Sequence, residues 1–178
     1  MDTITIHDST FRIFLQPGEI HDAVERIARQ LNNDLHDKDV IFLVILNGSF
    51  LFAADLLRNY HNSCRISFVK ISSYEGITNE GRIKELIGIN EILEDKTVVI
   101  VEDIVDTGNT LDCVINQIKE KHPAELKIVT LLLKPEAYEY PHKIDYIGFR
   151  IPNRFVVGYG LDYDGFGRNM TGIYSLVE

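Results

Sequence analysis

Residues 98–111 read VVIVEDIVDTGNTL and contain the clearest indication of the fold class. Its first residues form an unbroken apolar run, which predicts a strand at 97–101 that is buried on both faces. A polar loop over 102–109 follows, and from Leu111 onward apolar residues recur at helical spacing. We therefore expect a strand, a loop and a helix in succession, the repeating unit of α/β folds with a mostly parallel sheet.

The rest of the chain alternates between strand-like and helix-like segments in the same way. A helix is expected from Pro17, and a shorter one after a cap at Ser49. The packed face of the shorter helix is expected to carry Phe50, Ala54 and Leu57. Further strands are expected at 40–46, 65–72, 84–89, 126–133, 144–149, 155–159 and 172–177.

Length and charge narrow the class of protein. The 178 residues contain no internal repeat or linker, so we expect a single domain over 1–178. The net charge of −9 argues against a general nucleic-acid binder, which is usually basic. No apolar run approaches the roughly 20 residues of a membrane span, and the N-terminus lacks the pattern of a secretory signal. These features predict a cytoplasmic protein that binds neither nucleic acid nor membranes.

Cysteine and histidine are sparse and scattered. Cys64 and Cys113 are far apart and have no ligand-spaced partners, so we expect two buried thiols in a reducing compartment. The six histidines form no pair at metal-ligand spacing, and we interpret them as surface residues. A metal site built from histidine is therefore not expected.

The loop that follows residues 98–101 has the chemistry of an anion site. The N-terminus of a helix presents unsatisfied N–H groups and the positive end of the helix dipole. Gly108 lets the backbone approach an anion closely, and Thr107 and Thr110 add hydroxyl donors. A phosphate could bind here without a lysine.

Two carboxylates beside a phosphate pocket require a separate explanation, because like charges repel. Glu102 and Asp103 end the apolar run. Vicinal sugar hydroxyls donate hydrogen bonds to carboxylates, and magnesium takes oxygen ligands. An acidic helix start would account for one or two acids but not for Glu-Asp followed by Asp-Thr-Gly-x-Thr. The loop thus predicts a site for a phosphate, a ribose diol and Mg²⁺.

This stretch resembles the 5-phosphoribosyl 1-pyrophosphate (PRPP) motif of the type I phosphoribosyltransferases. Four other segments resemble the hypoxanthine-guanine branch of that family: 46–50 its pyrophosphate loop, 73–76 the start of its lid, and 131–134 and 155–163 its purine-binding elements. The resemblance begins near residue 17. It implies a mostly parallel central sheet flanked by helices, with a small hood, and transfer of phosphoribose from PRPP to N9 of hypoxanthine or guanine.

The resemblance also implies which residues hold the sugar phosphate and the leaving group. Ser73 and Tyr74 begin a polar, glycine-bearing stretch, 73–84, which we interpret as a loop of lid length. Residues implied to bind PRPP are Glu102, Asp103, Ile104, Val105, Thr107, Gly108, Asn109 and Thr110. Residues implied to bind pyrophosphate are Asn47, Gly48, Ser73, Tyr74 and Arg168.

For the purine, the resemblance implies Asp106 as the general acid/base and Lys134 as the donor to O6. A cation at that position favours an oxo group and rejects the amino group of adenine. Phe155 is implied to stack on the base, with Val156 reading its edge and Arg154 nearby. Asp162 is also implied to bind the purine. The implied metal ligands are Glu102, Asp103 and Asp162.

One residue departs from the family pattern, and alternatives stay open. Asn47 stands where the family usually has lysine, at a peptide bond that can be cis there. Lys134 does not separate hypoxanthine, guanine and xanthine. A nucleotide-sensing regulator that binds RNA on the same fold is a second reading, and a non-catalytic homologue a third. The family also implies a homodimer or homotetramer.

Overall fold

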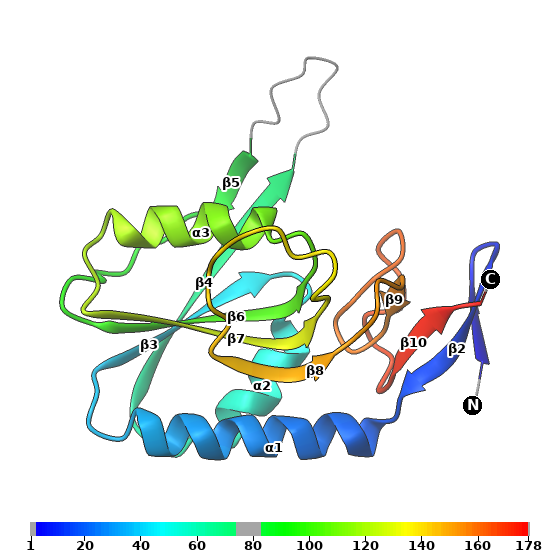
Figure 1. Ribbon diagram of the computed structural model, residues 1–178, viewed down its shortest axis with the longest axis horizontal. Helices are drawn as coiled ribbons and strands as arrows, with labels where there is room; N and C mark the ends of the chain where they lie inside the picture. The colour runs from blue at the N-terminus through cyan, green and yellow to red at the C-terminus, as the bar shows by residue number, and fades with distance from the viewer. Residues whose placement is uncertain (1–2, 74–82, 178) are drawn as a thin grey trace.

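The computed structural model describes residues 3–73 and 83–177, whose strands form two sheets (Figure 1). The larger sheet contains β3 (Val40–Leu46), β4 (Cys64–Ser73), β5 (Ile83–Ile87), β6 (Thr97–Val105), β7 (Glu125–Leu133) and β8 (Tyr146–Arg150). Their order across the sheet is β5-β4-β3-β6-β7-β8. All neighbours are parallel except β4 and β5. The expectation of an α/β fold with a mostly parallel sheet is confirmed.

Helices cover both faces of this sheet. α1 (Pro17–Asp34) and α2 (Phe50–Arg58) lie on one face, and α3 (Asn109–Lys119) lies on the other (Figure 1). α1 begins at Pro17 as expected, because proline suits the first turn, where no N–H bond is lost. The side chain of Glu19 reaches back and accepts a hydrogen bond from the Gln16 N–H at 2.8 Å.

The two faces of the sheet bury separate clusters of apolar side chains. Along β3, Phe42 and Val44 belong to the cluster under α1 and α2, whereas Ile41 and Leu43 belong to the cluster under α3. Such double-sided burial explains the continuous apolar run of this strand, since successive side chains point to opposite faces.

The smaller sheet forms the hood that the resemblance implied. It contains β1 (Thr3–Ile6), β2 (Ser9–Leu15), β9 (Val156–Val157) and β10 (Ile173–Leu176), in the order β1-β2-β10-β9. The first residues of the chain, outside the resemblance, therefore supply two of its strands. Both ends of the described chain lie at this hood (Figure 1). The strand expected at 155–159 is shortened to Val156–Val157 and belongs here.

Several expected boundaries are corrected by the structure. β6 continues through Glu102 to Val105, so the expected loop over 102–109 is reduced to 106–108. The pairing of β6 with β7 carries the strand on, because Glu102, Ile104 and Val105 all have partners in β7. The polar side chains at the end of β6 therefore belong to the strand and line a candidate ligand site.

The packed face of α2 agrees with the expected one only at Leu57, which packs against the core, whereas Ala54 is exposed. The buried side chains of α2 are Phe52, Ala53 and Leu56, while Phe50 is 42% exposed. Ser49 precedes the helix as expected but makes no capping hydrogen bond. A nine-residue helix that is apolar almost throughout has no distinct polar face from which the buried side could be read.

Other expectations are met in part. Cys64 and Cys113 are half-buried rather than fully buried. His142 is also partly buried, against the expectation of surface histidines. β4 extends to Ser73 and β5 begins at Ile83; the rest of the expected lid, including Tyr74, lies outside the described residues. Within the described residues, no helix combines the length and apolarity needed to span a membrane.

Candidate active site

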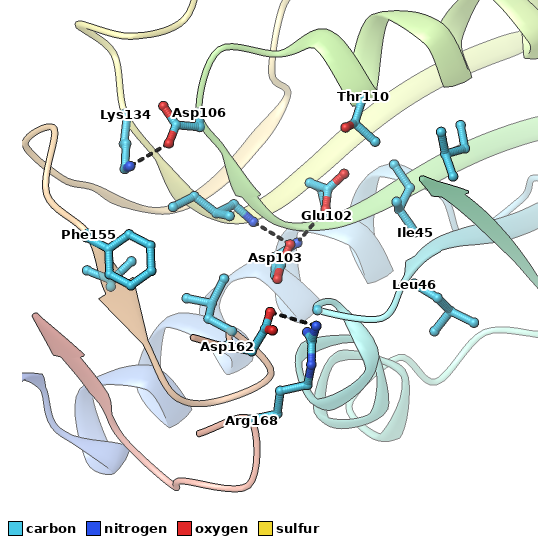
Figure 2. A pocket seen from close by; sticks show the side chains of 15 residues that line it. Ile45, Leu46, Glu102, Asp103, Asp106, Thr110, Lys134, Phe155, Asp162 and Arg168 are labelled. Carbon is cyan, nitrogen blue, oxygen red and sulfur yellow. Dashed lines mark hydrogen bonds and ion pairs between the residues drawn. The ribbon is translucent and has the colours of Figure 1, made fainter. Parts of the chain in front are cut away.

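A cavity of about 390 Å³ opens where β3, β6 and β7 end (Figure 2). This is the carboxyl edge of the parallel sheet, where ligands of α/β proteins bind. The hood closes its far side through Phe155, Val156, Asp162 and Arg168. The remaining lining residues are Ile45, Leu46, Gly48, Ile71, Glu102, Asp103, Ile104, Asp106, Thr110, Lys134 and Leu161.

Glu102 and Asp103 form a buried acidic pair on the floor of this cavity (Figure 2). Ser49 stands between them: its hydroxyl donates to Glu102 Oε1 at 3.4 Å and accepts from the Asp103 N–H at 2.9 Å. Burial raises the pKa of Glu102 well above its ordinary value, and the adjacent Asp103 charge raises it further. Burial also raises the pKa of Asp103. The pair is therefore costly to hold without a cationic or hydroxyl partner.

Gly48 is the residue that makes room for this pair. A Cβ atom at position 48 would lie 1.7 Å from Asp103 Oδ2, and a Cβ atom at Gly160 would lie 2.0 Å from Gly48 O. The turn after β3 thus packs directly against both the acidic pair and the hood. The peptide bond between Leu46 and Asn47 is cis, as the resemblance allowed. Asn47 itself is exposed.

Asp106 and Lys134 meet at the wall of the cavity (Figure 2). Lys134 Nζ donates to Asp106 Oδ2 at 2.5 Å, with the lysine side chain 8% exposed and the aspartate 46% exposed. They follow directly after β6 and β7, in which Val105 and Leu133 are paired. A cation and a carboxylate are thereby held side by side, a donor and an acceptor for a polar ring edge.

The turn at 107–110 leads into α3 and lines a smaller cavity of about 90 Å³. Gly108 has a φ of +95°, a left-handed conformation that suits glycine, and its carbonyl accepts the Asp112 N–H at 2.8 Å. Thr107, Asn109 and Thr110 are exposed. Among the residues implied to bind PRPP, Val105 does not present its side chain to a ligand, because this side chain is buried under α3.

The hood brings Asp162 and Arg168 together. Arg168 Nη2 lies 2.6 Å from Asp162 Oδ1, and its Nη1 donates to the Gly160 carbonyl at 2.7 Å. The Gly165 N–H donates to Asp162 Oδ2 at 2.7 Å. Arg154 does not line the main cavity and instead lines a neighbouring one with Phe155.

Some residues of the site carried no recognisable signal in the sequence. Ile45 and Ile71 line the cavity, yet as apolar residues of expected strands they predict only core packing. Ser49 is expected only as a helix cap, and its bond to Glu102 joins residues that are 53 positions apart in the chain. Within the described residues, no three acidic, histidine or cysteine side chains form a ready-made metal cluster.

Comparison with known proteins agrees with this geometry. Residues 15–164 match the family model described as phosphoribosyl transferase domain. The hypoxanthine-guanine phosphoribosyltransferase of Streptococcus pneumoniae is 38% identical, with 94% of this chain and 93% of that protein covered. The hypoxanthine phosphoribosyltransferase structure from Staphylococcus aureus is 34% identical, covers 93% of this chain and 91% of that one, and has a TM-score of 0.88.

A longer relative contains the same unit. The bifunctional protein TilS/HprT of Listeria monocytogenes is 32% identical over 95% of this chain, which spans only 26% of that protein. The matched length and the shared arrangement of sheet and hood lead to one conclusion: the chain belongs to the hypoxanthine-guanine phosphoribosyltransferase family.

Proposed function

We propose that this chain transfers the 5-phosphoribosyl group of PRPP to N9 of hypoxanthine or guanine, giving IMP or GMP and pyrophosphate. The observation that carries the proposal is the Asp106–Lys134 pair, which faces the same cavity as the acidic pair and the aromatic ring of Phe155. A base, a sugar diol and a phosphate each have suitable partners around this one space.

The base would lie between Phe155 and the Asp106–Lys134 pair. Phe155 is 47% exposed in the cavity wall, so its ring offers a surface for stacking. Lys134 would donate to O6 and leave adenine, which has only an amino group there, without a matching partner. The Val156 backbone would read the ring edge, and Arg154 would act close by.

Asp106 would serve as the proton acceptor. In the reaction the bond from C1 of the ribose to pyrophosphate breaks, the bond from N9 to C1 forms, and the purine loses one proton. A carboxylate at the imidazole edge accepts that proton. Because the aspartate is half exposed, the proton could then pass to solvent.

The sugar phosphate would be held at two places. Glu102 and Asp103 would accept hydrogen bonds from the ribose hydroxyls, which would relieve their buried repulsion. The turn 107–110, with Thr107, Gly108, Asn109 and Thr110, would bind the 5′-phosphate on its N–H and hydroxyl groups. Ile104 and Val105 would contribute backbone groups.

The donor set also fits Mg²⁺. The buried pair Glu102 and Asp103 supplies hard carboxylate oxygens whose like charges a dication would compensate, and Asp162 lies on the hood side of the same cavity. When bound with PRPP, the metal would neutralise charge on the departing pyrophosphate. The departing pyrophosphate would be held by Arg168, Gly48, Asn47, Ser73 and Tyr74.

We propose that the working unit is a homodimer or homotetramer. Ile66 and Phe68, both on β4, are 46% and 44% exposed, and Ile87 on β5 is 41% exposed. Large apolar side chains that are exposed on a sheet are typical of a protein–protein interface. Light scattering after gel filtration would test this proposal. We expect the parent chain to be a dimer or tetramer and the Phe68→Lys variant to be a monomer. A monomeric parent chain would contradict the proposal.

The remaining expectations stand as proposals of the same kind. Residues 1–178 are proposed to form one domain, because hood residues such as Leu161 and Ile173 share a core cluster with Phe42 of the central sheet. A cytoplasmic location is proposed from the net charge of −9.

The function is tested by mixing the protein with PRPP, Mg²⁺ and one base at a time. Nucleotide should form with hypoxanthine or guanine and not with adenine. The rates of nucleotide formation would show how xanthine compares with hypoxanthine and guanine as a substrate. Product with adenine alone, or no product with any base, would contradict the proposal. In the second case, Asn47→Lys would show whether the departure at that position had removed activity.

A further inference from the structure

The segment between β7 and β8 folds over the start of α3 (Figure 1). Two backbone bonds attach this segment to the end of β6 and to the turn that precedes the helix. The Lys134 N–H donates to Val105 O at 2.9 Å, and the Glu139 N–H donates to Thr107 O at 3.1 Å. The segment that carries the base-reading lysine is thus also the segment that covers the phosphate turn.

Two side chains of this segment bind the first turn of α3. Tyr140 Oη donates to Asn109 Oδ1 at 2.7 Å, and His142 Nε2 lies 2.6 Å from Asp112 Oδ1. The rings of Tyr140 and His142 are stacked, with centroids 6.1 Å apart and planes 6° apart. Asn109 and Asp112 are three positions apart and therefore share one helix face. We refer to Asn109, Asp112, Tyr140 and His142 as the clasp.

The clasp is reinforced by ring packing against Gly108. A Cβ atom at Gly108 would lie 2.5 Å from a ring carbon of Tyr138 and 3.0 Å from one of Tyr140. Tyr138 in turn donates to the His142 carbonyl at 2.9 Å. The left-handed glycine is therefore held from one side by aromatic rings.

These bonds have a consequence for anion binding. Since Asn109 Oδ1 accepts from Tyr140, the groups left on that amide are its two Nδ2 donors, which suit a phosphate. Asp112 would repel a phosphate at the helix start, and His142 Nε2 occupies one oxygen of that carboxylate at 2.6 Å. A turn held in its binding shape also loses less entropy when the ligand binds.

We propose that Tyr140 and His142 are positioning residues for the 5′-phosphate, which act through Asn109 and Asp112 and do not touch the substrate. The inference rests on the proposed function, because it assumes that the turn 107–110 binds a sugar phosphate. It adds that affinity for that phosphate is set in part by a segment on the opposite side of the turn.

The decisive variant is Tyr140→Phe, which removes one hydroxyl and keeps the ring. The matched control is Tyr146→Phe, which removes a hydroxyl that donates to Asp34 at 2.8 Å, away from the site. Calorimetry with PRPP and with ribose 5-phosphate should show about three- to tenfold weaker binding for Tyr140→Phe, the effect of one hydrogen bond. The control should bind as the parent does.

Kinetics separate positioning from general damage. For Tyr140→Phe we expect KM for PRPP to rise while kcat and KM for hypoxanthine stay within about twofold, as for loss of an interaction made equally in ground and transition states. In the double variant with Asn109→Ala, the tyrosine change should add nothing further, because it acts through that residue.

Two outcomes would overturn the inference: unchanged binding of both phosphates in Tyr140→Phe, or equal losses for PRPP and hypoxanthine together with the same loss in Tyr146→Phe. Failure of the proposed function looks different, because the parent chain would then make no nucleotide. The comparison of ribose 5-phosphate binding between the two tyrosine variants would still decide the role of the clasp.

Discussion

Lys134 Nζ lies 2.5 Å from Asp106 Oδ2, and this contact joins the ends of two neighbouring parallel strands. The pairing of Val105 with Leu133 in β6 and β7 places the next residue of each strand at the same edge. A shift of one position in that pairing would send one of the two side chains to the other face. The register of the sheet is thus a condition for the proposed chemistry.

Asp106→Asn should leave the fold intact and lower kcat by roughly 10²–10⁴, the usual effect of removing a general acid/base. The amide keeps the shape of the side chain and loses its capacity to accept a proton. Steady-state formation of IMP from PRPP and hypoxanthine measures the effect, with circular dichroism as a control for folding. A folded variant that retains near-normal kcat would show that this carboxylate does not move the proton.

Lys134→Gln should reduce discrimination between 6-oxopurines and adenine. The cation that donates to O6 is replaced by a neutral group that can both donate and accept. We expect kcat/KM for hypoxanthine to fall about 10- to 150-fold, the range for a charged hydrogen bond, while kcat/KM for adenine falls less. An unchanged ratio between the two bases would remove Lys134 from the selectivity mechanism.

Glu102→Gln should make the unliganded protein more stable and yet lower its activity with PRPP. Burial and the charge of Asp103 raise the pKa of Glu102, so a neutral amide relieves a cost in the unliganded state. We expect the free energy of unfolding in urea to rise by about 0.5–2 kcal/mol and kcat/KM for PRPP to fall at least about tenfold.

Glu120→Gln is the matched control for this variant, because Glu120 is exposed at the end of α3. It should change neither stability nor activity appreciably. A less stable Glu102→Gln protein would mean that the acidic pair is fully compensated by the chain itself.

Gly108→Ala tests the packing of the clasp on the phosphate turn. Alanine would meet both the positive φ of +95° and the Tyr138 ring at 2.5 Å. Gly165→Ala is the control, because Gly165 has a φ of +86° and nothing within 4 Å of the added atom. The strain of the left-handed backbone should cost each variant about 1–2 kcal/mol. Overpacking should add about 1–3 kcal/mol at position 108 only. Equal losses of stability in the two variants would show that the Tyr138 ring moves aside without cost.

Tyr159→Phe should change how stability depends on alkaline pH. Tyr159 Oη donates to Asp55 Oδ2 at 2.6 Å and joins the hood to α2. Burial, and then this bond, raise the pKa of Tyr159 above its ordinary value of 10. Its contribution to stability is therefore complete below pH 10 and is lost as the pH rises above 10, where only the unfolded chain releases the proton.

Urea unfolding between pH 7 and 11 checks this prediction. At pH 7 the variant should be less stable by about 1 kcal/mol, the value of one hydrogen bond. Above pH 10 the parent chain should lose stability more steeply than the variant, since the other tyrosines are common to both. Parallel curves would place the Tyr159 hydroxyl outside the pH response.

Much of the site could be predicted because its residues are contiguous. The stretch 102–110 combines the end of a strand, a short turn and a helix start. Local sequence predicts the turn and the helix start, whereas pairing with β7 extends the strand to Val105. The apolar run of β3 also predicted a strand, because a strand buried on both faces consists almost entirely of apolar residues.

The fold class, the start of α3 and the resemblance to the family all follow from residues that are neighbours in the chain. Three features became apparent in the folded chain alone: Ser49 joins Glu102 and Asp103, α2 buries Phe52 rather than Phe50, and Tyr140 donates to Asn109. The reason is physical: a turn or a periodic strand is specified by neighbours in the chain. The partner of a polar side chain is specified by which distant segments the packing of sheet, helices and hood brings within hydrogen-bonding distance.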